Sequence, residues 1–264
     1  MIKIIFFATA LLFFSCTGSN SSEKKTMSAD LPEEEKKLRE AIKAHPDSLM
    51  LVENLVQYFR DNNNYSEAIA ETEKALQRDS LNEKLWYMKA LMLFENEDTT
   101  KAITAWEKII KINPRPEYIK TLGFLYAITK DNMAIAMSDL MMRVSPPEAL
   151  FIKGIYFGKI GEKENAIAFF NECLRLNYKD LMAYREKAIA EYELGRYVDA
   201  LKTLELSLAV KQTYDEAYYW TGRCYEKLGK NKEAAENYQM AIQFAEGNDY
   251  PEAKDALGRM GIVQ

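Results

Sequence analysis

The sequence predicts an all-α protein in which helical hairpins stack side by side into a solenoid. Alanines recur at intervals of 34, 32, 32, 34 and 34 residues, at Ala68, Ala102, Ala134, Ala166, Ala200 and Ala234. A small residue stands eleven or twelve positions before most of these alanines, and a large residue stands four after most of them. Repeats of this length are single supersecondary units that bury their apolar faces only against neighbouring copies.

The first 15 residues have the pattern of a signal peptide. Lys3 supplies a positive charge, and residues 4–14 form an apolar run that is too short to span a bilayer as a mature helix. Ser15 and Cys16 follow, and this end resembles the lipobox of bacterial lipoproteins, with Phe13 where Leu is usual. The resemblance implies that Cys16 is lipidated and becomes the mature N-terminus. A plain secretory peptide cut elsewhere and an uncleaved anchor are the alternatives.

Residues 16–31 are expected to form a flexible tether behind the lipid. The segment is rich in Ser, Thr, Asn, Glu and Lys and has no apolar periodicity, so it cannot bury enough surface to fold. Thr17 stands where an Asp would indicate inner-membrane retention in some bacteria. We therefore expect export and anchoring to the outer membrane, facing the periplasm or the cell surface.

The solenoid is expected over residues 32–264, and it begins with half a repeat. Leu38, Ala41 and Ile42 form one face of a helix that ends before Pro46, and no matching first helix precedes it. Six hairpins follow, of which the first and third depart most from the pattern. Asn63 stands at the turn of the first hairpin where Gly is usual, and the third has a shortened loop before Ala134.

The sixth hairpin shows the pattern most clearly. Tyr218, Gly222 and Tyr225 recur at i, i+4 and i+7 and therefore share one face of a first helix. Gly229 then interrupts the pattern, and a left-handed residue there would close the helix. The return helix carries a second stripe, at Ala234, Tyr238, Ala241 and Ile242. Residues 251–260 read as a further helix that caps the open end of the array.

These hairpins resemble the tetratricopeptide repeat family. Residues 218–242, YYWTGRCYEKLGKNKEAAENYQMAI, match nearly every position of its pattern, and residues 85–114, 150–174 and 184–208 match it well. The resemblance covers roughly residues 33–260. It implies a right-handed superhelical solenoid of about six repeats, with an N-terminal half-repeat and a C-terminal capping helix.

The composition offers no support for an enzyme. His45 is the single histidine and stands at a helix end, and the sequence has no nucleophile elbow, no phosphate-binding glycine loop and no H-E-x-x-H. Cys173 and Cys224 fall on helix positions where small residues pack, so we expect them to be buried thiols. We therefore predict no catalytic residue, no cofactor and no metal site.

The net charge of −5 argues against a nucleic-acid partner. In the resembled family the first helix of every hairpin lines the concave side of the superhelix. Carried over to this sequence, the resemblance implies a groove for a partner segment. Its lining would include Tyr87, Phe94, Lys120, Phe124, Phe151, Arg185, Tyr192, Tyr219 and Arg223.

Aromatic rings among Lys and Arg favour a ligand with apolar side chains and some acidic groups. The alternative is that several of these residues pack against neighbouring helices and leave no groove. The carboxylate clamp of some family members requires Lys, Asn and Arg at set positions that this sequence does not fill. A free C-terminal carboxylate is therefore not the expected ligand.

The sequence thus predicts a lipid-anchored, non-enzymatic adaptor that binds an envelope protein or a segment of one in a Gram-negative bacterium. A pilotin-like assembly factor for a pilus or secretion system, or a scaffold that regulates an envelope enzyme, remains possible within that class. From a different class, a surface lipoprotein could capture a nutrient polymer by stacking sugars on its aromatic residues.

Overall fold

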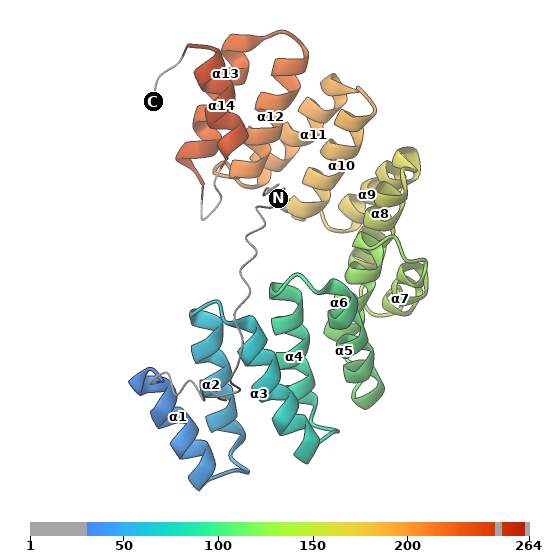
Figure 1. Ribbon diagram of the computed structural model, residues 1–264. Coiled ribbons are helices and arrows are strands. Elements are labelled where there is room, and N and C mark those ends of the chain that lie inside the picture. The colour runs from blue at the N-terminus through green and yellow to red at the C-terminus, as the bar shows by residue number, and fades with distance from the viewer. Residues whose placement is uncertain (1–30, 246–249, 262–264) are drawn as a thin grey trace, which may run out of the picture.

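A computed structural model describes residues 31–245 and 250–261, so Cys16 and nearly all of the predicted signal peptide and tether lie outside the described residues. Within the described ranges the chain forms α-helices and no strands, and the helices follow one another along a curved array (Figure 1). The predicted all-α solenoid is therefore confirmed. Among the described helices, none has the length and apolar character needed to cross a membrane.

The helices pair into hairpins as the repeat spacing predicts. A half-repeat and the first three hairpins comprise α1 (Glu33–Ala44), α2 (Leu49–Asp61), α3 (Tyr65–Arg78), α4 (Glu83–Glu95), α5 (Thr99–Ile112), α6 (Pro116–Ile128) and α7 (Met133–Met141). The other three hairpins and the capping helix comprise α8 (Pro146–Ile160), α9 (Lys163–Leu176), α10 (Leu181–Glu193), α11 (Tyr197–Val210), α12 (Asp215–Lys227), α13 (Asn231–Gln243) and α14 (Pro251–Arg259).

The repeated alanines form the core of each hairpin. All six have no exposed surface, and the small and large residues of the pattern meet beside them. A Cβ atom built on Gly222 would lie 2.7 Å from the ring of Tyr238, and one on Gly154 would lie 2.7 Å from Cδ1 of Phe170. Contacts this short show why the first helix has a glycine at these two positions, where the partner helix presents an aromatic ring.

Every hairpin turn contains one residue in the left-handed conformation. Gly229 adopts it with φ 73°, as predicted, and Asn63 adopts it with φ 57° in the first hairpin. Lys130 takes the same role in the shortened loop of the third hairpin. A left-handed residue at this position reverses the chain after one helix and lets the next begin within a few residues.

Both ends of the array are covered. At the N-terminal end, Arg39 of α1 donates a 2.7 Å hydrogen bond to Glu71 of α3. At the other end, α14 buries Leu257, and the ring of Tyr250 stacks on Tyr219 of α12 with 5.0 Å between ring centres. The predicted half-repeat and capping helix are therefore present, and each covers part of an apolar face that the array would otherwise expose.

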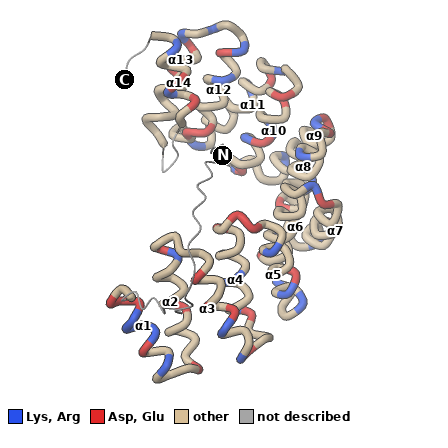
Figure 2. Tube along the Cα trace, viewed as in Figure 1, with Lys and Arg blue, Asp and Glu red and all other residues tan. Residues whose placement is uncertain are grey.

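The first helices of successive hairpins form the inner side of the curve. Helix α6 contacts α8, α8 contacts α10, and α10 contacts α12, whereas α7 lies at the outer edge (Figure 1). Lys and Arg alternate with Asp and Glu along the whole array, with no long stretch of one sign (Figure 2). From α6 to α12 the inner side therefore offers a continuous series of helix faces for contact with another molecule.

Candidate functional site

The most apolar hollow on the inner side lies at the middle of the array. It has a volume of about 310 Å³ and is formed by α6, α8 and the start of α10. Its lining consists of Lys120, Thr121, Phe124, Glu148, Phe151, Ile152, Asp180 and Met182. Three of the nine predicted groove residues, Lys120, Phe124 and Phe151, therefore come together at one place.

Two half-buried aromatic rings give this hollow its apolar character. Phe124 and Phe151 occupy corresponding faces of α6 and α8, and both pack against the large central core on one side. The centre of the Phe151 ring lies 5.9 Å from that of Phe170, which anchors it from behind. Met182 is 47% exposed and forms the third apolar wall from α10. The rings are thus held by the core yet remain accessible to a ligand.

The rim of the hollow is polar. Lys120 Nζ donates a 2.8 Å hydrogen bond to Glu148, so a cation and a carboxylate from successive hairpins neutralise each other. Asp180 caps α10 by accepting a 3.0 Å hydrogen bond from the backbone N–H of Ala183. Polar groups at the edge of an apolar surface fix the orientation of whatever binds there.

A second, wider hollow lies towards the N-terminal end, between the starts of α4 and α6. It measures about 660 Å³ and is bordered by Tyr87, which is 38% exposed. The Tyr87 ring meets that of Trp106 edge to face at 5.4 Å, so one side of the tyrosine is held by the core. Tyr118 donates a 2.5 Å hydrogen bond to Glu83, and this bond raises the pKa of the phenol.

A third hollow, of about 480 Å³, lies near the C-terminal end and includes Tyr192 and Arg223. The guanidinium of Arg223 lies over the ring of Trp220 at 5.0 Å and over that of Tyr192 at 5.2 Å. It also donates weak hydrogen bonds to the hydroxyls of Tyr192 and Tyr219, at 3.3 and 3.4 Å. Aromatic rings thus hold this cation in place by cation–π contacts.

Two of the predicted groove residues do not offer a free surface. Tyr219 is 2% exposed because Tyr250, at the start of the capping helix, covers its ring, and burial raises the pKa of its hydroxyl. Arg185 is ion-paired with both Glu186 and Glu216 at 2.7 Å, and its side chain is only 20% exposed. Tyr219 and Arg185 therefore stabilise the array. Phe94 is exposed at the end of α4 but lines none of the hollows described above.

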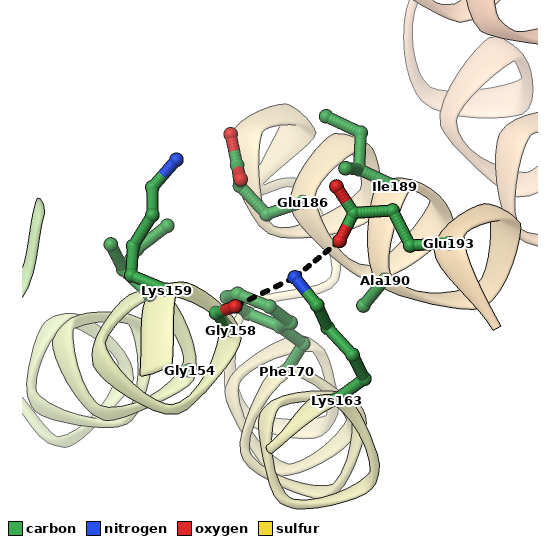
Figure 3. Close-up of a pocket in the computed structure, with 10 residues that line it drawn as sticks. Gly154, Gly158, Lys159, Lys163, Phe170, Glu186, Ile189, Ala190 and Glu193 are labelled. Carbon is green, nitrogen blue, oxygen red and sulfur yellow. Dashed lines mark hydrogen bonds and ion pairs between the residues drawn. The ribbon is translucent and has the colours of Figure 1, made fainter. Parts of the chain in front are cut away.

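A fourth cavity, of about 40 Å³, lies between α8, α9 and α10 (Figure 3). The ammonium of Lys163 bridges the backbone carbonyl of Gly158, at 2.6 Å, and the carboxylate of Glu193, as the dashed lines show. Carbonyls in the last turn of a helix lack an intrahelical donor, and Lys163 satisfies one of them. This polar cluster ties two hairpins together.

Five lining residues of the central hollow are absent from the sequence prediction: Thr121, Glu148, Ile152, Asp180 and Met182. Glu148 and Asp180 stand at the start of their helices, where acidic residues are ordinary. Met182 is neither aromatic nor cationic, and the predicted groove residues are all of these two kinds. Asp180 could have been recognised as the residue that precedes the Leu181 helix. Its closeness to Phe151 depends on how successive hairpins stack, and the repeat spacing in the sequence does not determine that stacking.

Metal-ligating and thiol side chains form a separate class of candidate site residues. No group of three or more His, Cys, Asp or Glu in the described ranges is placed to hold a metal ion. Cys173 and Cys224 are fully buried, as predicted, and burial raises the pKa of each thiol to about 12. Both therefore remain protonated at neutral pH and act as small apolar core residues.

Comparison with known families agrees with this architecture. One model described as a tetratricopeptide repeat matches residues 53–115 and 185–251, and a second matches residues 147–180. Together these matches cover more than half of the chain. The chain belongs to the tetratricopeptide repeat family. The repeat is generally a non-enzymatic scaffold for protein–protein interaction.

Individual tetratricopeptide repeat proteins are distant relatives. The human Superkiller complex protein 3 is 30% identical over 111 residues, which are 42% of this chain and 7% of that protein. The Hsp70-Hsp90 organizing protein of Triticum aestivum is 22% identical over 219 residues, 79% of this chain and 37% of that protein. The chain thus spans well under half the length of either relative.

Two solved structures share the fold. A tetratricopeptide repeat protein from Parabacteroides merdae superposes with a TM-score of 0.68 at 20% identity, covering 85% of this chain and 90% of that one. PilW, described as a type IV pilus biogenesis factor, superposes with a TM-score of 0.59 at 21% identity over 77% of this chain and 96% of that one. At this level of identity the likeness concerns the fold alone.

Proposed function

We propose that this protein is a non-enzymatic adaptor that binds a segment of a partner protein in the central hollow. The observation that carries the proposal is the pair of half-buried rings, Phe124 and Phe151, on facing positions of successive first helices. Both rings are fixed by the core behind them, and neither is covered by another helix of the array.

The shape and chemistry of the hollow support a peptide segment as the ligand. Its volume of about 310 Å³ is at the lower end of the range for ligand pockets, so it accepts one or two side chains. Rigid aromatic walls lose little conformational entropy on binding, which is why aromatic side chains dominate binding energy at interfaces. Further hollows lie at Tyr87 and at Tyr192, towards the two ends of the array, and an elongated segment that follows the array would reach more than one of them.

Site-specific cross-linking in cells tests the proposal. A photoreactive amino acid at Met182, on the wall of the central hollow, should yield a discrete adduct with a partner protein. The same amino acid at Leu206, which is similarly exposed but lies on the second helix α11, serves as the matched control. Adducts from Leu206 alone, or identical adducts from both positions, would place the interaction elsewhere.

We further propose that Cys16 carries a lipid that anchors the protein to the outer membrane, with residues 17–31 as the tether. Support comes from the sequence: a charged start, an apolar run and a cysteine directly after it. Wild-type protein should partition into the detergent phase, and Cys16→Ser should leave it in the aqueous phase or unprocessed. Unchanged processing and partitioning of the variant would refute the anchor.

A further inference from the structure

The charges around the central hollow differ from the sequence expectation, and they bear on which partner it takes. The expectation of an acidic ligand depended on cations such as Lys120 and Arg185. Both are already paired, Lys120 with Glu148 at 2.8 Å and Arg185 with Glu186 and Glu216 at 2.7 Å. An acidic ligand would have to displace carboxylates that the protein itself supplies.

Asp180 is the carboxylate of the hollow that no cation balances. One oxygen accepts the capping hydrogen bond from Ala183, and the Sγ of Cys173 lies 3.9 Å from the other. None of the ion pairs among the described residues includes Asp180, and the ammonium of neighbouring Lys179 lies over the Tyr178 ring. The charged lining residues are Lys120, Glu148 and Asp180, so the hollow is negative by one charge.

The pair at the opposite rim can add to this negative charge. The Lys120 and Glu148 side chains are 46% and 40% exposed, and exposed ion pairs are weak enough to exchange partners. A cationic ligand could therefore share Glu148 with Lys120 while it contacts Asp180. An anionic ligand would find only Lys120, and Glu148 would compete for it.

From this arrangement we infer that the central hollow selects a segment in which an apolar side chain lies next to lysine or arginine. The inference rests on the proposed function and names the chemistry of its ligand. The apolar side chain fills the space between Phe124, Phe151 and Met182, and the adjacent cation reaches Asp180. Complementary charge of this kind adds specificity and speeds encounter more than it adds affinity.

A phage-displayed library of random peptides, selected on the purified wild-type protein, tests this inference. Selections on the Phe124→Ala/Phe151→Ala variant identify the peptides that do not depend on the hollow. The peptides that remain should be enriched in Lys or Arg beside a large apolar residue and depleted in Asp and Glu. Enrichment in Asp or Glu, or no charge preference at all, would overturn the charge rule and leave the hollow as a binding site.

Substitution of Asp180 separates the effect of its charge from its structural role as a helix cap. Asp180→Asn removes the charge but keeps the helix cap, because Asn and Asp are equally good at that position. We expect it to weaken a selected cationic peptide by about threefold to tenfold and to reduce the salt dependence of binding. Lys120→Met removes the cation that competes for Glu148 and should therefore strengthen binding of the same cationic peptide. Unchanged affinity in Asp180→Asn would refute the inference. If all selected peptides bind Phe124→Ala/Phe151→Ala as tightly as they bind the wild type, the proposed function is refuted instead.

Discussion

Single residues set the distance between the two helices of each hairpin. Gly154 and Gly158 both lie on α8 and face α9 one turn apart, yet their surroundings differ. A Cβ on Gly154 would lie 2.7 and 2.8 Å from two ring atoms of Phe170, whereas a Cβ on Gly158 would lie 3.6 Å from that of Ala166, an ordinary contact. Both glycines are helical, but only Gly154 occupies the position of the repeat at which a larger residue would clash with the partner helix.

This contrast gives a matched pair of substitutions. Gly154→Ala should lower the free energy of unfolding by about 1–3 kcal/mol, because the ring of Phe170 must move within a packed core. Gly158→Ala fits without a clash and should leave stability unchanged or raise it by up to ~1 kcal/mol, since Ala is the better helix former. Urea unfolding followed by circular dichroism measures both. Equal effects would show that the close approach does not limit packing.

At the scale of helices, polar contacts join successive repeats, and the two partners of each contact are separated in sequence by about one repeat length. Arg39 contacts Glu71, Arg196 contacts Glu164 and Arg259 contacts Glu226, and the partners in these pairs are 32 or 33 residues apart. Each pair joins equivalent elements of neighbouring hairpins. Apolar stacking supplies most of the adhesion, and these pairs add polar contacts between neighbouring units.

The contact between α1 and α3 predicts a pH dependence. Burial alone would raise the pKa of Glu71, but hydrogen bonds from Lys74 and Arg39 outweigh it and hold the pKa below its ordinary 4.5. A lowered pKa means that the folded state binds the proton less tightly than the unfolded state. This contribution to stability is therefore present above pH 4.5 and is lost as the pH falls below it.

Unfolding measurements at neutral pH and below pH 4.5 test this point. The stability of Glu71→Gln should fall less steeply with acid than that of the wild type, because this carboxylate no longer titrates. Glu67→Gln, an exposed substitution on the same helix, should follow the wild type. Parallel acid profiles for all three proteins would mean that Glu71 contributes nothing to the pH dependence.

The capping helix provides a second test at this scale. Tyr250 donates a 2.7 Å hydrogen bond to Asp215, which is 7% exposed. Tyr250→Phe removes the hydroxyl donor and should cost about 1–3 kcal/mol, because a buried carboxylate loses a hydrogen bond. Hydrogen exchange should show faster opening of α12–α14 and unchanged protection in α2–α6. Uniform loss of protection along the chain would contradict a modular array.

For the whole molecule, the fold follows from the spacing because the same residue pattern recurs in most of the hairpins. A small residue, an alanine and a large residue recur around most hairpins, and this pattern predicts the helices, the buried Cys173 and Cys224 and the left-handed Gly229. The same pattern predicts on which face of its helix a residue lies, but it does not predict whether that face is open to a ligand. Which faces stay open depends on neighbours that the repeat pattern does not include.

Three residues show where that limit falls. Tyr219 occupies a lining position but is covered by Tyr250, which lies outside the repeats. Arg185 was expected to attract a ligand, but Glu216 of the next hairpin neutralises it. Asp180 has the ordinary sequence pattern of a helix cap, and only the stacking of α8 and α10 brings it beside Phe151.

The central claim is that the hollow between α6, α8 and α10 binds a partner segment. Isothermal titration of a peptide selected on the wild-type protein, compared with Phe124→Ala/Phe151→Ala, tests it most directly. The double variant should bind at least about tenfold more weakly, since each ring is expected to contribute ~1–3 kcal/mol. Val198→Ala/Leu206→Ala, which truncates two exposed apolar residues of α11, should bind as the wild type does. Wild-type affinity in a folded Phe124→Ala/Phe151→Ala protein, verified by circular dichroism, would contradict the claim.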